Sequence, residues 1–164
     1  MIKFELLNKS DFLSISNEIY NIFAHNMSNI APTDKLREED YKIWYEAVSD
    51  GLQKDARQII LIKDNENIIG FFQYYTNADT FMMEEIQFKP EYQGKGVFRK
   101  LYGFVFSNIR TDIKFVEAYT HINNFKSIGI LQKFGFSNIG FAMNGSLYHF
   151  KGEFEDLVKW YENK

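Results

Sequence analysis

The sequence predicts a single mixed α+β domain built on a mostly antiparallel sheet of six to seven strands. Three observations lead to this prediction. Segments with strand-like alternation recur along the chain, segments with helical spacing of apolar residues lie between them, and no repeat or low-complexity linker divides the 164 residues. Hydrophobic residues make up 45% of the chain, which suits one packed core. We therefore expect one domain over residues 1–164.

One strand and two helices are expected first. Residues 2–6 alternate between apolar and polar side chains, as strands do. A helix with one apolar face follows, and a second helix is expected to end at Gly51, because glycine often terminates helices. The residues able to cap these helices are Ser10 or Asp11 for the first and Thr33 or Asp34 for the second.

Three strands without intervening helices come next and are expected to pair antiparallel. They comprise residues 58–63, 67–75 and 80–88, with turn-forming residues between them. The short turn after the first of these strands predicts a hairpin. The third strand is expected to stop before Pro90, because proline cannot continue a ladder.

The third strand leads through a glycine-rich turn, residues 93–97, into a helix. A helix start presents unpaired N–H groups and a partial positive charge. Gly94 and Gly96 have no Cβ, so an anion can approach the backbone closely. Basic residues beside the turn are Lys95 and Arg99. The pattern predicts a phosphate or pyrophosphate pocket, and the alternative is an ordinary strand-to-helix turn with incidental glycines.

The remaining elements alternate between strand and helix. Residues 114–120 form a strand that must run parallel to strand 80–88, because a helix crosses between them. Asn123 or Asn124 can cap the next helix, which ends at Gly135. The last predicted elements are strands 138–143 and 147–150, joined by a hairpin turn at Asn144-Gly145, and a tail helix over 154–161.

Two familiar phosphate-binding loops do not fit the glycine turn. A P-loop has Ser or Thr after its lysine, but Lys95 is followed by Gly96, and a dinucleotide loop needs a third glycine where Arg99 stands. The turn instead resembles the acetyl-CoA loop of the GNAT superfamily of N-acetyltransferases. The pattern of that loop, Gln/Arg-x-x-Gly-x-Gly/Ala after a strand, matches at Gln93 and Gly96 and departs at Phe98.

A second block of residues carries the same resemblance. Asn124, Ser127, Gly135 and Phe136 match the Asn, the small residue and the closing Gly-Phe that accompany the glycine loop in this superfamily. The predicted element order also resembles that of the superfamily over nearly the whole chain. The resemblance implies the GNAT fold, which has helices on both faces of the central sheet and a splayed strand pair.

The resemblance implies acetyl-CoA as the donor and a primary amine, of a small molecule or a peptide, as the acceptor, with no metal. The pantetheine arm would lie between the splayed strands, and the pyrophosphate would lie on the amides of the glycine turn. The expected donor contacts are Ile86, Gln87, Phe88, Gln93, Gly94, Lys95, Gly96, Val97, Phe98, Arg99, Asn124 and Ser127.

The amine must lose a proton before it attacks, and Glu84 and Glu85 are candidates for the base. Strand alternation places Glu84 on the face of Ile86, and we expect Glu84 to be the catalytic base. The alternative is that both are solvated strand carboxylates. Many superfamily members have a Tyr seven residues after the Asn, but Leu131 stands there. The acid for the leaving thiolate is then a nearby residue such as Tyr119, a water molecule, or absent.

The missing tyrosine permits an alternative function, a non-catalytic acyl-CoA-binding module. A third candidate function is a plain binder of nucleotide phosphates, which would bind ATP and CoA equally well. The net charge of -3 argues against nucleic acid as a partner. The chain has no cysteine and no apolar run of about 18 residues. We therefore expect a cytoplasmic protein without membrane contact, present as a monomer or a homodimer.

Overall fold

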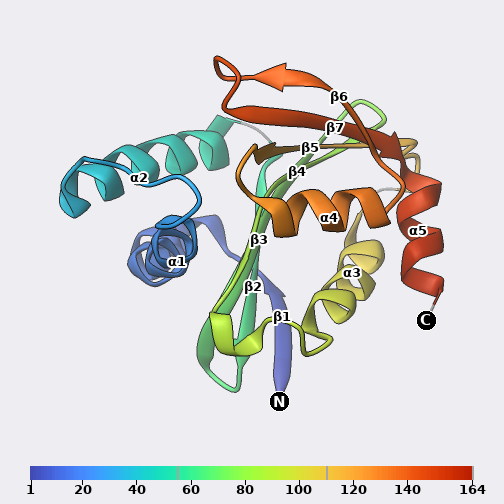
Figure 1. The fold of residues 1–164 in the computed structure, drawn as a ribbon. Coiled ribbons are helices and arrows are strands. Elements are labelled where there is room, and N and C mark those ends of the chain that lie inside the picture. The colour runs from blue at the N-terminus through green and yellow to red at the C-terminus, as the bar shows by residue number, and fades with distance from the viewer. Residues whose placement is uncertain (55, 110, 164) are drawn as a thin grey trace.

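The computed structural model describes residues 1–54, 56–109 and 111–163, and over these ranges one seven-stranded sheet runs through the molecule (Figure 1). The strand order is β1-β2-β3-β4-β5-β7-β6. The strands are β1 (Ile2–Leu6), β2 (Gln58–Asp64), β3 (Asn67–Asn77), β4 (Thr80–Phe88), β5 (Phe115–His121), β6 (Ser137–Ala142) and β7 (Leu147–Glu153). The α-helices are α1 (Phe12–Met27), α2 (Arg37–Lys54), α3 (Val97–Asn108), α4 (Phe125–Lys133) and α5 (Phe154–Glu162).

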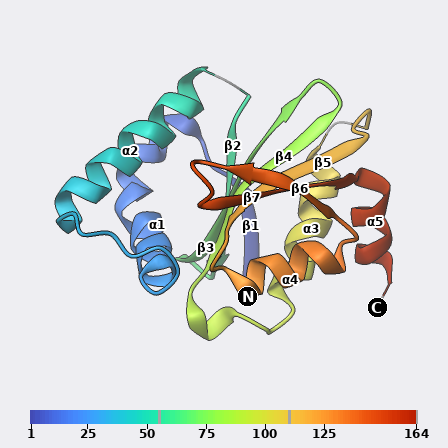
Figure 2. The ribbon, with the colours of Figure 1, turned by 45° about the horizontal axis from the view of Figure 1, so that its top comes forward.

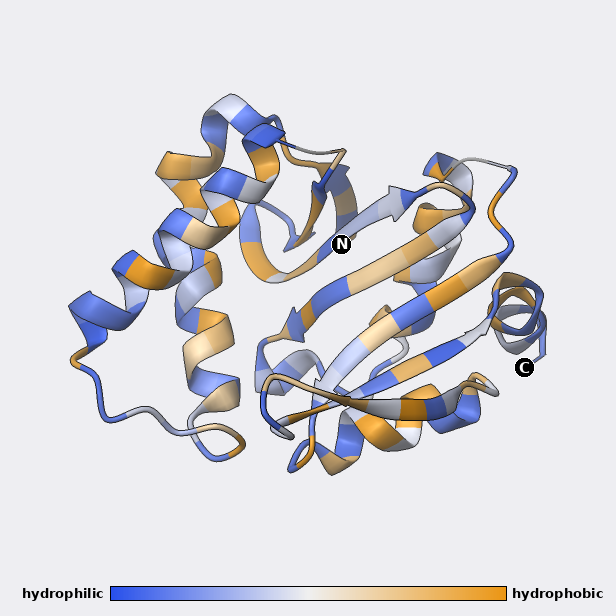
Figure 3. Ribbon diagram, turned by 90° about the horizontal axis from the view of Figure 1, so that it is seen from above, coloured by the Kyte–Doolittle hydropathy of each residue, from blue (hydrophilic) through white to orange (hydrophobic). Residues whose placement is uncertain are grey.

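Helices cover both faces of the sheet, with α1 and α2 on one side and α3, α4 and α5 on the other (Figure 2). The alternation of β2 explains how one strand serves both layers. Ile59 and Leu61 pack with α1 and α2, whereas Ile60 and Ile62 pack with α3 and the other two helices. Figure 3 shows this mixture of hydrophobic and hydrophilic residues along the strands. The predicted mixed α+β fold with helices on both faces is confirmed.

The sheet opens between its central strand, β4, and the neighbouring strand β5. These strands are parallel, as predicted, but they pair only from Thr80 to Met83 on β4 and from Phe115 to Ala118 on β5. Beyond Met83, β4 continues to pair with β3 alone. The splay expected from the family resemblance is therefore present.

A β-bulge interrupts β4 at the point where the two strands separate. Tyr74 of β3 lies opposite Met83, but the preceding residue, Gln73, lies opposite Glu85. Glu84 is consequently an extra residue on β4 without a partner in the register. Such a residue bends the strand and increases its local twist.

The bulge inverts the alternation of side chains along the rest of β4. Phe81 and Met83 before the bulge and Ile86 and Phe88 after it all belong to the core beside α3 and α4. Without the bulge, these two pairs would point to opposite faces. The prediction that Glu84 shares a face with Ile86 is therefore wrong, because it assumed an unbroken alternation.

Most element bounds were predicted within a few residues, and the clearest error is the end of α2. This helix continues past Gly51 to Lys54 because Leu52 is 4% exposed and extends the apolar face that packs on the sheet. Strand β7 also runs to Glu153, three residues beyond its predicted end at 150. Within the described ranges, no helix is long and apolar enough to cross a membrane.

Candidate functional site

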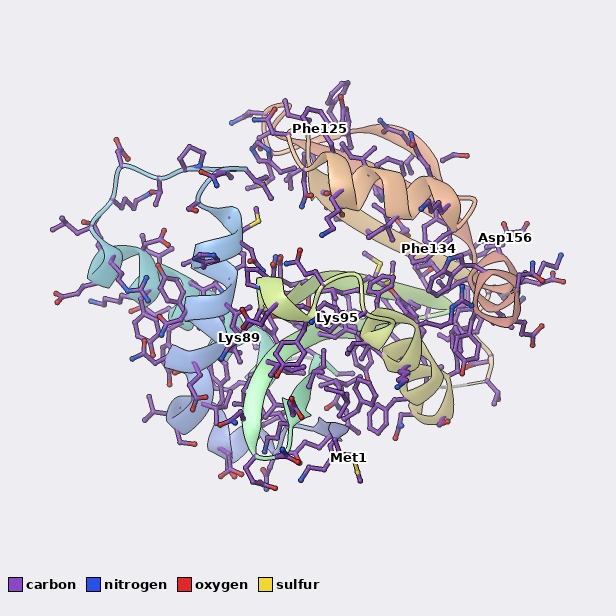
Figure 4. The ribbon with its side chains drawn as sticks, turned by 60° about the horizontal axis from the view of Figure 1, so that its bottom comes forward. Met1, Lys89, Lys95, Phe125, Phe134 and Asp156 are labelled. Carbon is purple, nitrogen blue, oxygen red and sulfur yellow. The ribbon has the colours of Figure 1, made fainter. Side chains whose placement is uncertain are left out.

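A cavity of about 720 Å³ occupies the opening between β4 and β5. Its walls come from β4, the glycine turn, the end of β5, helix α4 and the segment that leaves α1. Figure 4 shows Lys95, on the turn before α3, and Phe134, which directly follows α4, in the part of the molecule where these elements face each other. The cavity therefore joins the two sequence blocks that carry the family resemblance.

The glycine turn has the backbone geometry that an anion site requires. Gly94 and Gly96 have φ angles of 74° and 81°, in the left-handed region that favours glycine. Gly96 is the N-cap of α3 and supplies no side-chain cap to the amides of the first turn. A Cβ built on either glycine has no neighbour within 4 Å, so the space beside this backbone is open. The helix start can accept an anion on its main-chain donors.

Arg99 uses its side chain in a way that the sequence did not predict. Its guanidinium donates to the carbonyl oxygens of Trp160 at 3.0 Å and Tyr161 at 2.5 Å. It also lies over the Trp160 ring, 4.6 Å from the ring centroid. The guanidinium therefore binds the end of α5, where helix carbonyls lack partners and a cation is favoured.

Phe98 departs from the family pattern because its side chain belongs to the core. The ring lies within 6.4 Å of Phe88, Tyr102, Phe134 and Trp160, centroid to centroid. These neighbours come from β4, the segment that closes α4, and helices α3 and α5. The bulky residue therefore joins the helical layer to the sheet beside the glycine turn.

Gln93 connects the glycine turn to both neighbouring elements. Its Nε2 donates to the carbonyl oxygen of Phe88 at 3.1 Å, and its Oε1 accepts from Nζ of Lys126 on α4 at 2.6 Å. The cap of α4 is formed as predicted, because Oδ1 of Asn124 accepts from the amide of Ser127 at 3.1 Å. Both Asn124 and Ser127 line the cavity.

The ladder between β3 and β4 determines which main-chain groups face the opening. The amide of Lys89 donates to Ile69 at 2.8 Å, which identifies Phe88 as a position that exchanges no hydrogen bonds with β3. The main-chain groups of Phe88, and of Ile86 two residues earlier, point away from β3 toward the opening. The main-chain groups of Gln87 point toward β3, so Gln87 lines the cavity through its side chain.

The two carboxylates at the bulge have different partners. Oε1 of Glu84 accepts from Nε of Arg57 at 2.9 Å and from Nε2 of Gln73 at 3.2 Å. The Arg57 guanidinium also lies over the ring of Tyr75, 4.6 Å from its centroid. Glu84 is thus held in a partly buried ion pair with Arg57.

Glu85 has no cation beside it in the described contacts. Its Oε1 accepts from Nε2 of Gln87 at 2.5 Å, and Oε1 of Gln87 accepts from Nδ2 of Asn26 at 2.9 Å. Burial raises the pKa of Glu85 to about 7, the Gln87 hydrogen bond opposes this rise, and the charge of Glu84 adds to it. Glu85 therefore changes protonation state near neutral pH, as a general base should.

The side of the cavity formed by β5 contains an exposed tyrosine. Tyr119 is 43% exposed, lines the cavity and stacks on the His149 ring at a centroid distance of 4.3 Å. His149 in turn contacts Glu117 at 2.6 Å. Leu131, which replaces the usual tyrosine, lines the same cavity and is 5% exposed.

Sequence reasoning missed Asn26 and the side-chain role of Gln87. These two residues are 61 positions apart, and no motif or spacing relates them. Their contact exists only because α1 ends beside the open part of β4. Within the part of the chain that the structure describes, no cluster of three or more His, Asp or Glu residues could hold a metal ion.

Comparison with known proteins relates most of the chain to one family. The family model described as acetyltransferase (GNAT) family matches residues 16–136. No curated protein matches the sequence. Similar solved structures include an acetyltransferase from Streptococcus agalactiae, with a TM-score of 0.71 and 13% identity over 93% of this chain and 98% of that chain.

Two further structures were solved with ligands. The PaiA N-acetyltransferase from Thermoplasma acidophilum, in complex with coenzyme A, has a TM-score of 0.69 and 18% identity over 94% of this chain and 99% of that chain. The spermidine N-acetyltransferase from Vibrio cholerae, in complex with CoA and spermine, has a TM-score of 0.63 and 19% identity. That match covers 96% of this chain and 98% of the Vibrio chain. At these identities the structures establish a shared fold.

Proposed function

The chain belongs to the acetyltransferase (GNAT) family, whose members use acetyl-CoA, and we propose that it transfers the acetyl group to a primary amine by direct attack in a ternary complex. One observation carries the proposal. A single cavity joins Gln93 and Gly94 at the start of the glycine turn, the open edge of β4 and a partly buried carboxylate whose pKa lies near neutrality, and the uncapped start of α3 at Gly96 follows directly beyond it. These are the features needed to bind a diphosphate, to position its acyl arm and to deprotonate an amine.

The donor is proposed to bind along the open edge of β4. Main-chain amides from Gly94 to Arg99 hold the pyrophosphate, and Lys95 adds positive charge at the surface. The open main-chain groups of Ile86 and the amide of Phe88, whose carbonyl oxygen already accepts from Asn26 and Gln93, bond the pantetheine arm, which takes the place of a missing strand. The remaining expected contacts are Gln87, Gln93, Val97, Phe98, Asn124 and Ser127, of which all except Val97 line the cavity.

The acceptor is proposed to be a cationic alkyl amine, free or on a peptide. Glu84 and Glu85 both line the cavity on its β4 side. Among the described lining residues, the one Lys or Arg is Lys126, and its ammonium is bound to Gln93 at the start of the glycine turn. This distribution attracts a positive charge to the β4 side and disfavours an amine with a carboxylate next to it. The spermine bound by the Vibrio cholerae relative belongs to the same chemical class.

Glu85 is a better candidate for the base than Glu84, which remains the alternative from the sequence. The Arg57 ion pair stabilises the charge of Glu84, whereas burial without a cation favours a proton on Glu85. In the proposed reaction Glu85 takes a proton from the ammonium, directly or through water. The neutral nitrogen then attacks the thioester carbon, the C–N bond forms and the C–S bond breaks. The leaving thiolate takes a proton from Tyr119 or from water, and the second proton that the nitrogen loses as the amide forms replaces it.

The proposal is tested by a turnover screen with the full chain. Acetyl-CoA is incubated with polyamines, simple alkyl amines, aminoglycosides, amino acids and peptide N-termini, and both CoA thiol release and the mass of the acetylated amine are measured. We expect the highest kcat/KM for alkyl amines without a neighbouring carboxylate. Donor binding without amine-dependent CoA release would identify the chain as a non-catalytic acyl-CoA-binding module.

A further inference from the structure

A continuous chain of side-chain hydrogen bonds runs from α1 to Glu85. Nδ2 of Asn26 donates to the carbonyl oxygen of Phe88 at 2.8 Å and to Oε1 of Gln87 at 2.9 Å. Nε2 of Gln87 then donates to Oε1 of Glu85 at 2.5 Å. The three side-chain partners line the cavity, and Gln87 is only 8% exposed. A buried polar network of this kind holds its members in defined orientations.

The groups at the two ends of this series of hydrogen bonds, the Phe88 carbonyl and the Glu85 carboxylate, fix the direction of each bond between them. The Phe88 carbonyl can only accept, so Asn26 must turn its NH₂ group toward it. The second hydrogen of the same NH₂ group reaches Gln87, which must therefore present its oxygen to Asn26. The NH₂ group of Gln87 consequently faces Glu85, whose ionised carboxylate also only accepts.

We propose that Asn26 and Gln87 are positioning residues that keep Oε1 of Glu85 as an acceptor and leave Oε2 as the oxygen that takes the proton from the amine. This inference rests on the proposed function, because it concerns the base of that reaction. Gln87 cannot reverse its amide without losing its contact with Asn26. It therefore donates to Oε1 in both protonation states of Glu85, and the incoming proton is directed to the other oxygen.

Other titratable groups surround Glu85 and must be separated from this effect. Glu84 precedes it on β4 and is paired with Arg57, which follows α2. His25 of α1 and the β5 residues Tyr119 and His121 line the same cavity. None of these groups contributes a hydrogen bond to Glu85 in the described contacts. Their influence acts through space, whereas Gln87 acts through a direct contact that a substitution can remove.

Two substitutions test the inference by different routes. Gln87→Met keeps an unbranched side chain of similar length but removes the donor to Glu85. Asn26→Asp replaces the donor to Gln87 with an acceptor, so the Gln87 amide is expected to turn over and present its oxygen to Glu85. Each change should move the pKa of Glu85, and with it the acid limb of the kcat/KM profile, upward by about one pH unit or more.

Asn29→Asp is the matched control for added charge. Asn29 lines the same cavity three residues after Asn26, and no described hydrogen bond joins it to Gln87. The pKa is measured twice, from the pH dependence of kcat/KM and from carbon-detected NMR titration of the Glu carboxyl signals, with Glu85→Gln identifying the resonance. We expect Asn26→Asp to shift both values by several times the shift of Asn29→Asp.

The two measurements separate the inference from the proposed function. Wild-type protein that acetylates an amine, with a Gln87→Met variant whose pKa for Glu85 is unchanged, overturns the inference and leaves the function standing. An Asn26→Asp shift no larger than that of Asn29→Asp overturns it as well. If no amine is acetylated, the proposed function fails, and the NMR titration still decides whether Asn26 and Gln87 control the protonation of Glu85.

Discussion

Glu85 lowers the unfolding free energy of the protein at alkaline pH, because its folded-state pKa of about 7 lies above the ordinary value of 4.5. A raised folded-state pKa gives a stabilising contribution that is complete below about pH 4.5 and is lost as the pH rises through 7. Glu85→Gln cannot ionise. At pH 8 we expect its unfolding free energy to exceed that of wild type by about 1–3 kcal/mol, which raises its melting temperature. At about pH 4.5 we expect the two proteins to melt at the same temperature.

Glu84→Gln is the matched control for this measurement. The wild-type carboxylate is bonded to Arg57 at 2.9 Å, so removing its charge should lower the unfolding free energy at pH 8 by about 1 kcal/mol or less, and the melting temperature with it. In thermal melts at about pH 8 we therefore expect Glu85→Gln to raise the melting temperature and Glu84→Gln to lower it. Equal destabilisation by both substitutions would show that Glu85 is not disfavoured as an anion.

The same two variants separate the candidates for the base. Glu85→Gln should reduce kcat by about 10²- to 10⁴-fold and remove the acid limb near pH 7 from the rate profile, because the group that must lose its proton is gone. Glu84→Gln should keep that limb and alter mainly the KM for a cationic amine. Steady-state kinetics from pH 5.5 to about 9 measure both effects. The reverse pattern would return the role to Glu84.

At the scale of elements, the close packing of β3 against β4 depends on Gly70. A Cβ at Gly70 would lie 2.5 Å from the carbonyl oxygen of Gln87 and 3.3 Å from Cα of Phe88. Both atoms belong to the backbone, so no rotamer change relieves the contact. We expect Gly70→Ala to lower the unfolding free energy by about 1–3 kcal/mol in denaturant titrations.

Gly129 in α4 is the matched control for that substitution. A Cβ there has no neighbour within 4 Å, and the residue lies inside a helix. Gly129→Ala should therefore raise the unfolding free energy by about 0.5–1 kcal/mol. A higher unfolding free energy for both Gly70→Ala and Gly129→Ala would contradict the tight contact described between β3 and β4.

Elements whose signals are local were predictable from the sequence. The bounds of β4, the start of α3 at Val97 and the cap at Asn124 each depend on residues within a few positions. The bulge at Glu84 was not predictable, because it exists only in the register of β4 against β3. The Arg99 contact with α5 and the Asn26 contact with Gln87 likewise join residues about sixty positions apart.

At the scale of the whole molecule, bound acetyl-CoA should stabilise the sheet by contacting both strands at the splay. Four residue pairs join β4 to β5, and the cavity fills the rest of that boundary. A ligand that binds the folded state at about 100 times its Kd adds about 2.7 kcal/mol to the unfolding free energy. For a chain of this length we expect acetyl-CoA to raise the melting temperature by about 5–10 °C in one cooperative transition.

Gly96→Val should remove most of that ligand-induced rise, since a branched side chain would cover the open backbone of the glycine turn. The substitution also strains a residue with a φ of 81°, so each variant is compared with its own ligand-free melting temperature. Gly145→Val is the control, because Gly145 has a similar φ of 84° in the β6–β7 turn. An unchanged rise in Gly96→Val would count against the proposed donor site.

The single extra residue of β4 has a consequence for insertions and deletions. Removing Glu84 would return β4 to a plain two-residue alternation in its present register, with Met83 opposite Tyr74 and Glu85 opposite Gln73. Phe88 would keep its place in the core beside α3 and α4, and Gln87 would stay on the side of α1. A deletion at this one position would therefore remove the bend and the Arg57 ion pair while the rest of β4 keeps its faces, whereas the same deletion in an unbulged strand would turn over everything beyond it.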